Sequence, residues 1–364
     1  MDRSTANNVL CELLRSTSDL PPIADWKEVI EQCDRERITP FLYNRLRRQP
    51  AWQSVPTTAQ TAFQTINTSA AAKELLRHKE ASRHLAVIEA AGLKPITFKG
   101  AALAYEFYEE PHCRPRMDTD LLFANQAQAE KAALLLEADN YALSPLHEGD
   151  LMSKAFTLSK LDPTGILEHQ FDLHWRIAYE HRYQEIFEYQ KLLPQCRLNA
   201  FGYRVPPPLV SLLISCIHNE SERPNNYHNR LVWYVDLKLL SEKLHKRDWD
   251  TLLQQAAELQ VGDAVLNMLH PASTCLAFNL PTGLTQQLQQ SGRLGTVENF
   301  HSTRQVIRNL GYLSPRQKTR YLWQLLFPPP SSMKAEYAVT NKAELLAAYF
   351  RRIGNRLKLY LLKK

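Results

Sequence analysis

Two aspartates at the start of an apolar run are the residues most suited to chemistry in this sequence. Asp118 and Asp120 lie two residues apart, and residues two apart on a strand point to the same face. Two neighbouring carboxylates repel each other, whereas Mg²⁺ prefers hard carboxylate oxygens together with substrate phosphates. The pattern therefore predicts a divalent-metal site on a strand.

A lysine–glycine pair lies about 18 residues earlier, between a β-like run over Leu93–Phe98 and an expected helix over Ala101–Tyr108. A glycine at such a turn lets the backbone approach a ligand closely. The first amides of the following helix favour anions, and Lys99 adds a positive charge beside Gly100. A phosphate binder and a metal binder in one short segment predict the handling of a metal–nucleoside triphosphate.

A second acidic strand is expected further along the chain. The runs Ser153–Leu161 and Gly165–Trp175 are joined by an Asp-Pro-Thr-Gly turn, which predicts a β-hairpin. Alternation in the second run puts the apolar side chains on one face, and it puts on the other face Glu168, Gln170, Asp172 and His174. Asp172 is then either a third site carboxylate or a solvated edge residue, and His174 is either a site residue or a structural hydrogen-bonder.

These residues resemble the signature of the uncharacterised nucleotidyltransferases, a family within the polymerase-β-like superfamily. The signature reads lysine-glycine, a short helix, Arg-Pro, two residues and Asp-x-Asp-Leu-Leu, which here are Lys99-Gly100, Arg114-Pro115 and the run from Asp118 to Leu122. The run Asp-Leu-His-Trp that begins at Asp172 is similar to another motif of this family. One departure is Ala101, because the superfamily carries Gly-Ser or Gly-Gly at this loop.

The resemblance implies an α+β fold with a mixed sheet and flanking helices, and an enzyme that transfers a nucleoside monophosphate to a hydroxyl and releases pyrophosphate. It implies that two Mg²⁺ ions are held by Asp118, Asp120 and Asp172, the last also accepting the hydroxyl proton. The nucleotide, expected to be ATP, would be bound by Lys99, Gly100, Ala101, Arg114 and His174. Arg114 has an alternative role, which is to pair with Glu109 or Glu110.

The resemblance leaves the acceptor open between a small molecule and a protein or tRNA, as in toxin-type relatives. A second hypothesis is a non-catalytic nucleotide-binding or regulatory protein that keeps the fold. Ala101 favours this alternative because the loop hydroxyl is missing, whereas retention of three mutually repelling carboxylates argues against it.

Composition limits the class of protein. A length of 364 residues predicts more than one domain, and no run of 18 uncharged apolar residues suggests a membrane span. The six cysteines are scattered, which predicts reduced thiols in a cytoplasmic protein. The net charge of +6 is too small to predict a nucleic-acid groove. A basic helix over Leu345–Leu362 is expected to be docked, with binding to an anionic surface as the alternative.

Three consecutive domains are expected. Residues 1–91 read as an N-terminal helical region, residues 92–205 as the α/β nucleotidyltransferase core, and residues 206–364 as a helical domain that begins at three consecutive prolines. Within the last domain, buried charges are expected to pair. Asp236 is therefore expected to pair with Arg230 or His218, or else to line the acceptor pocket. The oligomeric state is not predicted.

Overall fold

The structure, a computed structural model, describes residues 3–16, 20–161, 167–183, 187–222, 230–291 and 303–362. The chain divides into two compact units, each of which joins three separate stretches of sequence. Unit 1 comprises Met1–Arg83, Thr97–Asp118 and Gln195–Gly295, and unit 2 comprises His84–Ile96, Thr119–Pro194 and Thr296–Lys364. The expected domains were consecutive segments, and their boundaries stay a prediction.

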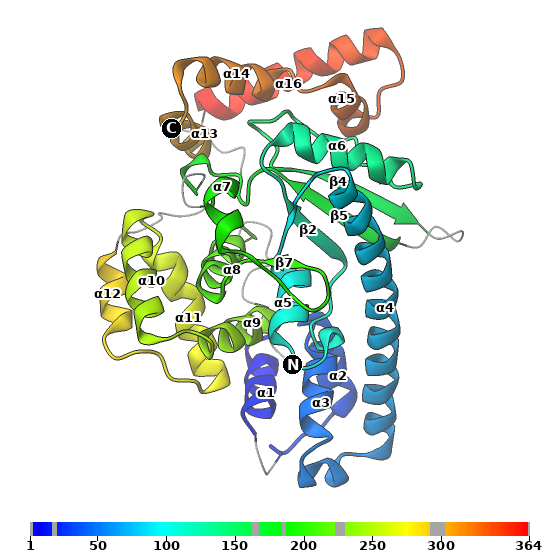
Figure 1. Cartoon of the computed structure of the whole chain (residues 1–364), viewed down its shortest axis with the longest axis vertical. Coiled ribbons are helices and arrows are strands. Elements are labelled where there is room, and N and C mark those ends of the chain that lie inside the picture. The colour runs from blue at the N-terminus through cyan, green and yellow to red at the C-terminus, as the bar shows by residue number, and fades with distance from the viewer. Residues whose placement is uncertain are drawn as a thin grey trace. The chain divides into compact units, whose positions relative to one another are not determined.

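Unit 1 is mainly helical (Figure 1). Its elements are α1 (Arg3–Arg15), α2 (Trp26–Arg35), α3 (Thr39–Leu46), η1 (Pro50–Ser54), most of α4 (Thr57–Ala90), α5 (Lys99–Phe107), η2 (Pro111–Cys113), β6 (Arg197–Leu198), β7 (Arg204–Val205), α8 (Pro208–Glu222), α9 (Leu231–Ser241), α10 (Lys246–Glu258), α11 (Gly262–Leu276) and α12 (Leu284–Gln290). The Asp25 side chain caps the start of helix α2, because it accepts hydrogen bonds from the amides of Lys27 and Glu28 at 2.8 and 3.2 Å. Helix α4 is one continuous helix of 34 residues.

A disulfide bond joins α1 to α11 within unit 1. Cys11 and Cys275 are bonded although 264 residues separate them in the sequence, and their Cα atoms lie 5.0 Å apart. The expectation that all six cysteines are reduced is therefore wrong for this pair. The physical reason is that the packing of two distant helices, rather than any local spacing, brings the two sulfur atoms together.

Asp236 of α9 forms a buried ion pair with Arg114. Nε and Nη2 of Arg114 donate to the carboxylate at 2.9 and 2.8 Å, and the Tyr108 hydroxyl donates to Oδ1 at 2.7 Å. The expected pairing of Asp236 with Arg230 or His218 is wrong, because the chain folds the segment after α5 against α9. Asp236 is 2% exposed and Arg114 is 7% exposed, so each charge depends on the other.

A mixed sheet forms the centre of the α/β part (Figure 1). In the described residues it has five strands in the order β1-β2-β5-β4-β3. These are β1 (Ile96–Phe98), β2 (Asp118–Leu122), β3 (Ala142–Leu143), β4 (Ala155–Leu161) and β5 (Leu167–His174). The predicted hairpin is confirmed, because β4 and β5 pair antiparallel with Thr157 opposite Asp172. The turn over residues 162–165 lies outside the described residues.

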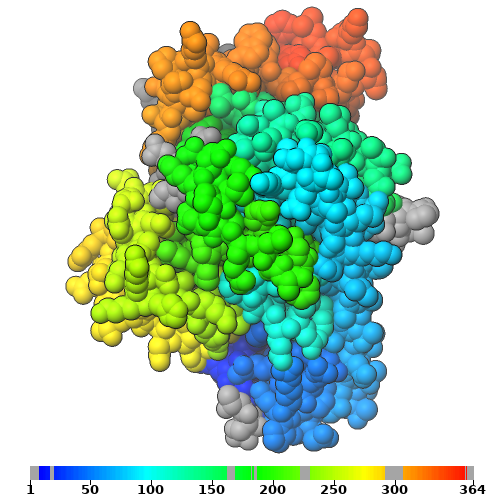
Figure 2. Space-filling view, in the orientation of Figure 1, coloured from blue at the N-terminus to red at the C-terminus, as the bar shows by residue number. Residues whose placement is uncertain are grey.

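Helices complete unit 2. They are α6 (Gln126–Glu137), η3 (His181–Tyr183), α7 (Tyr189–Leu192), η4 (Leu193–Gln195, whose last residue belongs to unit 1), α13 (Thr303–Gly311), α14 (Pro315–Leu326), α15 (Pro330–Tyr337) and α16 (Lys342–Leu362). Figure 2 shows the orange and red C-terminal helices lying beside the teal surface of α6. Arg352 of α16 is 2% exposed and pairs with Glu336 at 2.6 Å and with Glu148. The terminal helix is therefore docked on unit 2 through a buried charge. Among the described helices, none is long and apolar enough to cross a membrane.

We expect Asp236→Asn to destabilise the protein by about 3–5 kcal/mol, because it leaves Arg114 buried without its counter-charge. Urea denaturation measures this loss. Asp250→Asn, at an exposed aspartate of α10 in the same unit, is the matched control and should change the free energy of unfolding by less than about 0.5 kcal/mol. Equal stability of the two variants would contradict the assignment.

Candidate functional site

Two carboxylates and one imidazole meet on one face of the unit 2 sheet. One ligand atom each from Asp120, Asp172 and His174 all lie within 4.8 Å of one another. Asp120 is 2% exposed and His174 is 1% exposed, whereas Asp172 is partly exposed. The cluster therefore has a buried base and an accessible side.

The sheet positions these side chains through the pairing of its central strands. The Phe123 amide donates to the main-chain oxygen of His174 at 2.8 Å, which places the end of β2 beside the end of β5. On the other side of β5, the Thr157 hydroxyl donates to Asp172 Oδ1 at 2.7 Å from the directly opposite position of β4. Gln170 Nε2 lies 3.4 Å from the same oxygen. The predicted polar face is thereby confirmed for residues 170, 172 and 174; the Glu168 side chain lies outside those described.

His174 is held between two acceptors. Its Nδ1 lies 3.1 Å from the main-chain oxygen of Arg176, and its Nε2 lies 2.9 Å from Asp120 Oδ1. A carbonyl oxygen only accepts, so Nδ1 carries a proton. If Nε2 is also protonated, the imidazolium donates a hydrogen bond to Asp120. If Nε2 is not protonated, its lone pair and the carboxylate point at the same space, which favours a cation bound between them. Either state puts positive charge beside the buried Asp120.

The opposite face of the sheet carries a separate buried chain of hydrogen bonds. Thr119 Oγ1 lies 3.1 Å from His169 Nε2, and Tyr141 Oη lies 2.9 Å from His169 Nδ1. Thr119 and His169 each neighbour a residue of the acidic face in sequence and point the other way, as alternation requires. These groups fix the strand positions from behind and are not available to a ligand, since Thr119 and His169 are both 0% exposed.

The lysine–glycine turn lies in unit 1, where α5 begins. Lys99 has a φ of +53°, a left-handed conformation that costs a residue with a side chain about 1 kcal/mol or more. Its Nζ lies 5.1 Å from the centroid of the Phe98 ring. A Cβ atom on Gly100 would lie only 3.0 Å from Arg114 Nη1, so glycine lets that guanidinium approach closely without a shift. Ala101 is fully buried.

Arg114 lies over the turn but does not pair with its acidic neighbours. Glu109 pairs with Arg48 at 2.7 Å and Glu110 with Arg47 at 3.6 Å, so the alternative pairing expected for Arg114 is wrong. Burial acts to lower the pKa of Arg114, but the charge and hydrogen bonds of Asp236 outweigh it and raise the pKa. Arg114 is therefore permanently charged, with Nη1 directed at Gly100.

Asp118 is the first residue of β2 and belongs to unit 1. Its main-chain oxygen accepts a hydrogen bond from Arg116 Nη1 at 2.8 Å. Its charge acts on the arginines of unit 1, and it raises the pKa of Arg37 and Arg77 against the opposing effect of burial. Asp118 precedes Asp120 by two residues on β2.

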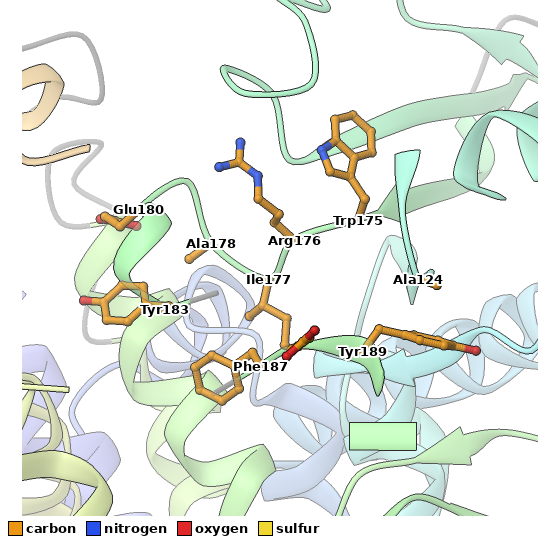
Figure 3. Close-up of a pocket in the computed structure, with 10 residues that line it drawn as sticks. Ala124, Trp175, Arg176, Ile177, Ala178, Glu180, Tyr183, Phe187 and Tyr189 are labelled. Atoms are coloured by element: carbon orange, nitrogen blue, oxygen red, sulfur yellow. The ribbon is translucent and has the colours of Figure 1, made fainter. Parts of the chain in front are cut away.

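A pocket of about 350 Å³ lies in unit 2 directly after the end of β5. In Figure 3, Ile177 is directed towards Phe187 and Tyr189, whereas Trp175 and Arg176 project to the other side. Arg176 Nη2 donates to the main-chain oxygens of Leu151 and Ser153 at 2.9 and 2.8 Å, and burial lowers the pKa of Arg176 to about 10. Most residues that line the pocket come directly after His174 in the sequence, and the aromatic ones among them suit a flat organic group. The sequence reading did not single it out, although the aromatic residues after His174 are a visible signal.

A mixed sheet that gathers acidic side chains on one face, flanked by helices, defines an α+β protein with the architecture expected of a nucleotidyltransferase domain. The family model described as uncharacterised nucleotidyltransferase matches residues 22–277, and the chain belongs to this family. No curated protein matches the chain. The resemblance drawn from the motifs is thereby confirmed at the level of the family.

The cluster suggests a test on metal binding alone. We expect Asp172→Asn to weaken Mn²⁺ binding at least about tenfold, because a hard anionic ligand is replaced by a neutral amide. Electron paramagnetic resonance of free Mn²⁺ measures the affinity. Glu137→Gln, at an exposed position of α6 in the same unit, should bind like wild type. Unchanged affinity in Asp172→Asn would argue against a metal site here.

The conformation of Lys99 leads to a second expectation. Lys99→Gly relieves the left-handed strain, so it should leave the thermal midpoint equal or higher while nucleotide affinity falls. Lys99→Ala keeps the strain and removes the charge, so its thermal midpoint should stay close to that of wild type while its affinity falls. Differential scanning fluorimetry with and without ATP separates these effects. A stable Lys99→Gly protein with wild-type ATP affinity would exclude Lys99 from the nucleotide site.

Proposed function

We propose that the protein transfers a nucleoside monophosphate from a nucleoside triphosphate, expected to be ATP, to a hydroxyl of an acceptor. The oxygen of the acceptor forms a bond to the α-phosphorus, the bond from that phosphorus to the bridging oxygen of the β-phosphate breaks, and pyrophosphate leaves. The observation that carries this proposal is the gathering of Asp120, Asp172 and His174 within 4.8 Å in a chain of this family.

Asp172 is the residue that we assign to the proton transfer. It is the accessible carboxylate of the cluster, and Thr157 holds one of its oxygens at 2.7 Å, which fixes the orientation of the other. In the reaction it accepts the proton of the acceptor hydroxyl. Asp120 is oriented by His174, so its carboxylate keeps one direction throughout.

The donor set fits Mg²⁺. Asp120 and Asp172 supply hard carboxylate oxygens on one face of the sheet. Asp118 precedes Asp120 by two residues on one strand, so alternation directs its carboxylate to the same face of β2, and we propose it as a further ligand. When bound, the metal would stabilise negative charge on the transferring phosphoryl group.

For the nucleotide we propose Lys99, Gly100 and the first amides of α5 as the triphosphate contacts, with Arg114 maintaining the shape of the turn. Ala101 has no hydroxyl with which to bind a phosphate, and we propose that the Lys99 side chain makes that phosphate contact instead. The aromatic pocket after His174 supports a place for the base or for the organic part of the acceptor. A small molecule, a protein side chain or a tRNA end is the acceptor class to screen.

The transfer is tested with α-³²P-labelled nucleoside triphosphates, Mg²⁺ and a panel of hydroxyl acceptors. We expect labelled product with wild type, a loss of at least about 10²-fold with Asp120→Asn or Asp172→Asn, and wild-type rates with Glu137→Gln. Calorimetry with ATP accompanies each variant. Binding of ATP without product across the whole panel would instead support the non-catalytic nucleotide-binding alternative.

A further inference from the structure

A cavity of about 550 Å³ lies entirely within unit 1. Its lining comes from one face of α4, from the end of α2 to the start of α3, and from η2 to Met117, the residue before Asp118. Its charged lining consists of four cationic side chains and two carboxylates, namely Arg37, Lys73, Arg77 and Arg116 against Asp34 and Glu74. The cavity therefore has an excess of positive charge.

The carboxylates leave much of this charge uncompensated. Glu74 Oε1 accepts from Nε and Nη2 of Arg116 at 3.0 and 2.8 Å, and both residues are buried, so this pair neutralises itself. Asp34 is exposed to solvent. Arg37 Nη2 lies 3.8 Å from the sulfur of Met117, and the buried Nε of Arg77 has no hydrogen-bond partner. In the part of the chain that the structure describes, no carboxylate forms a salt bridge with Arg37 or Arg77.

The like charges also act on one another. Burial lowers the pKa of Arg37, and the neighbouring Arg230, Arg114 and Arg77 lower it further, whereas Asp118 opposes them. Burial likewise lowers the pKa of Arg77, and Arg116 adds to that effect, whereas Glu74 and Asp118 oppose it. Arg37 has in addition a φ of +57°, a left-handed backbone that costs free energy in a residue with a side chain. A fold that gathers strained, crowded cations around a cavity is stabilised when an anion enters it.

We propose that this cavity binds a phosphate-bearing group of a substrate of the transfer reaction. Arginine forks bind phosphate oxygens in pairs, and Lys73 adds a mobile charge one turn from Arg77 on the same helix face. A volume of about 550 Å³ suits a small molecule rather than a single ion. The assignment rests on the proposed function for its substrate, and the phosphate belongs either to the part of the triphosphate that extends beyond Lys99 and Gly100 or to a phosphorylated acceptor.

The test is calorimetric titration of the full-length protein, without divalent metal and at low ionic strength, with pyrophosphate and separately with ribose 5-phosphate. The variants are Arg77→Gln and the double variant Lys73→Gln/Arg77→Gln. Lys79→Gln is the matched control, because Lys79 is exposed on the same helix and does not line the cavity. We expect Arg77→Gln to weaken binding about tenfold, the double variant more, and the control less than twofold. Thermal midpoints verify that each variant is folded.

The two probes distinguish the sources. Weaker binding of pyrophosphate alone assigns the cavity to the triphosphate, and weaker binding of ribose 5-phosphate alone assigns it to an acceptor phosphate. The proposal would be overturned if wild type bound neither probe. It would also be overturned if both variants bound each probe as tightly as wild type and the control do. Anion binding without any nucleotidyl transfer would refute the proposed function and leave the anion site standing.

Discussion

The hydrogen bond between His174 and Asp120 is the interaction on which the rest of the acidic site depends. Both side chains are almost fully buried, and an isolated carboxylate in such surroundings would lose most of its hydration free energy. His174 compensates this charge only because the main-chain oxygen of Arg176 fixes its ring. The end of β5 must therefore stay beside β2, and the chain of hydrogen bonds through His169 on the other face helps to hold it there.

Unit 1 follows the same electrostatic rule with a different result. Among the described residues of this unit, the buried arginines Arg114 and Arg116 each pair with a buried carboxylate, in Asp236 and Glu74 respectively. A buried ion pair adds little net stability, yet breaking one is costly, so both pairs restrict how the helices pack. Arg37 and Arg77, which have no salt bridge to a carboxylate among the described residues, line the cavity of unit 1, where an anionic ligand can supply the counter-charge.

The Cys11–Cys275 bond adds a covalent constraint to this unit, because it joins the N-terminal helix to α11 across most of the sequence. A cross-link over so long a segment limits the unfolded ensemble strongly. The other described cysteines, Cys33, Cys113, Cys196 and Cys216, keep their thiols. Redox state is therefore a variable to control in any measurement on this protein.

Local sequence determined the elements and the family. The Asp25 cap, the uninterrupted run of α4, the hairpin and the alternation that joins Gln170, Asp172 and His174 all follow from spacings of two to four residues, which short-range sterics decide. Tertiary structure alone decided the partners: Arg114 with Asp236, Cys11 with Cys275, His174 with Asp120. Such pairs lie 54 to 264 residues apart, and many partners of suitable charge compete at that range. The cationic face of α4 reads in sequence like any solvated face, and only packing against other segments makes it a cavity.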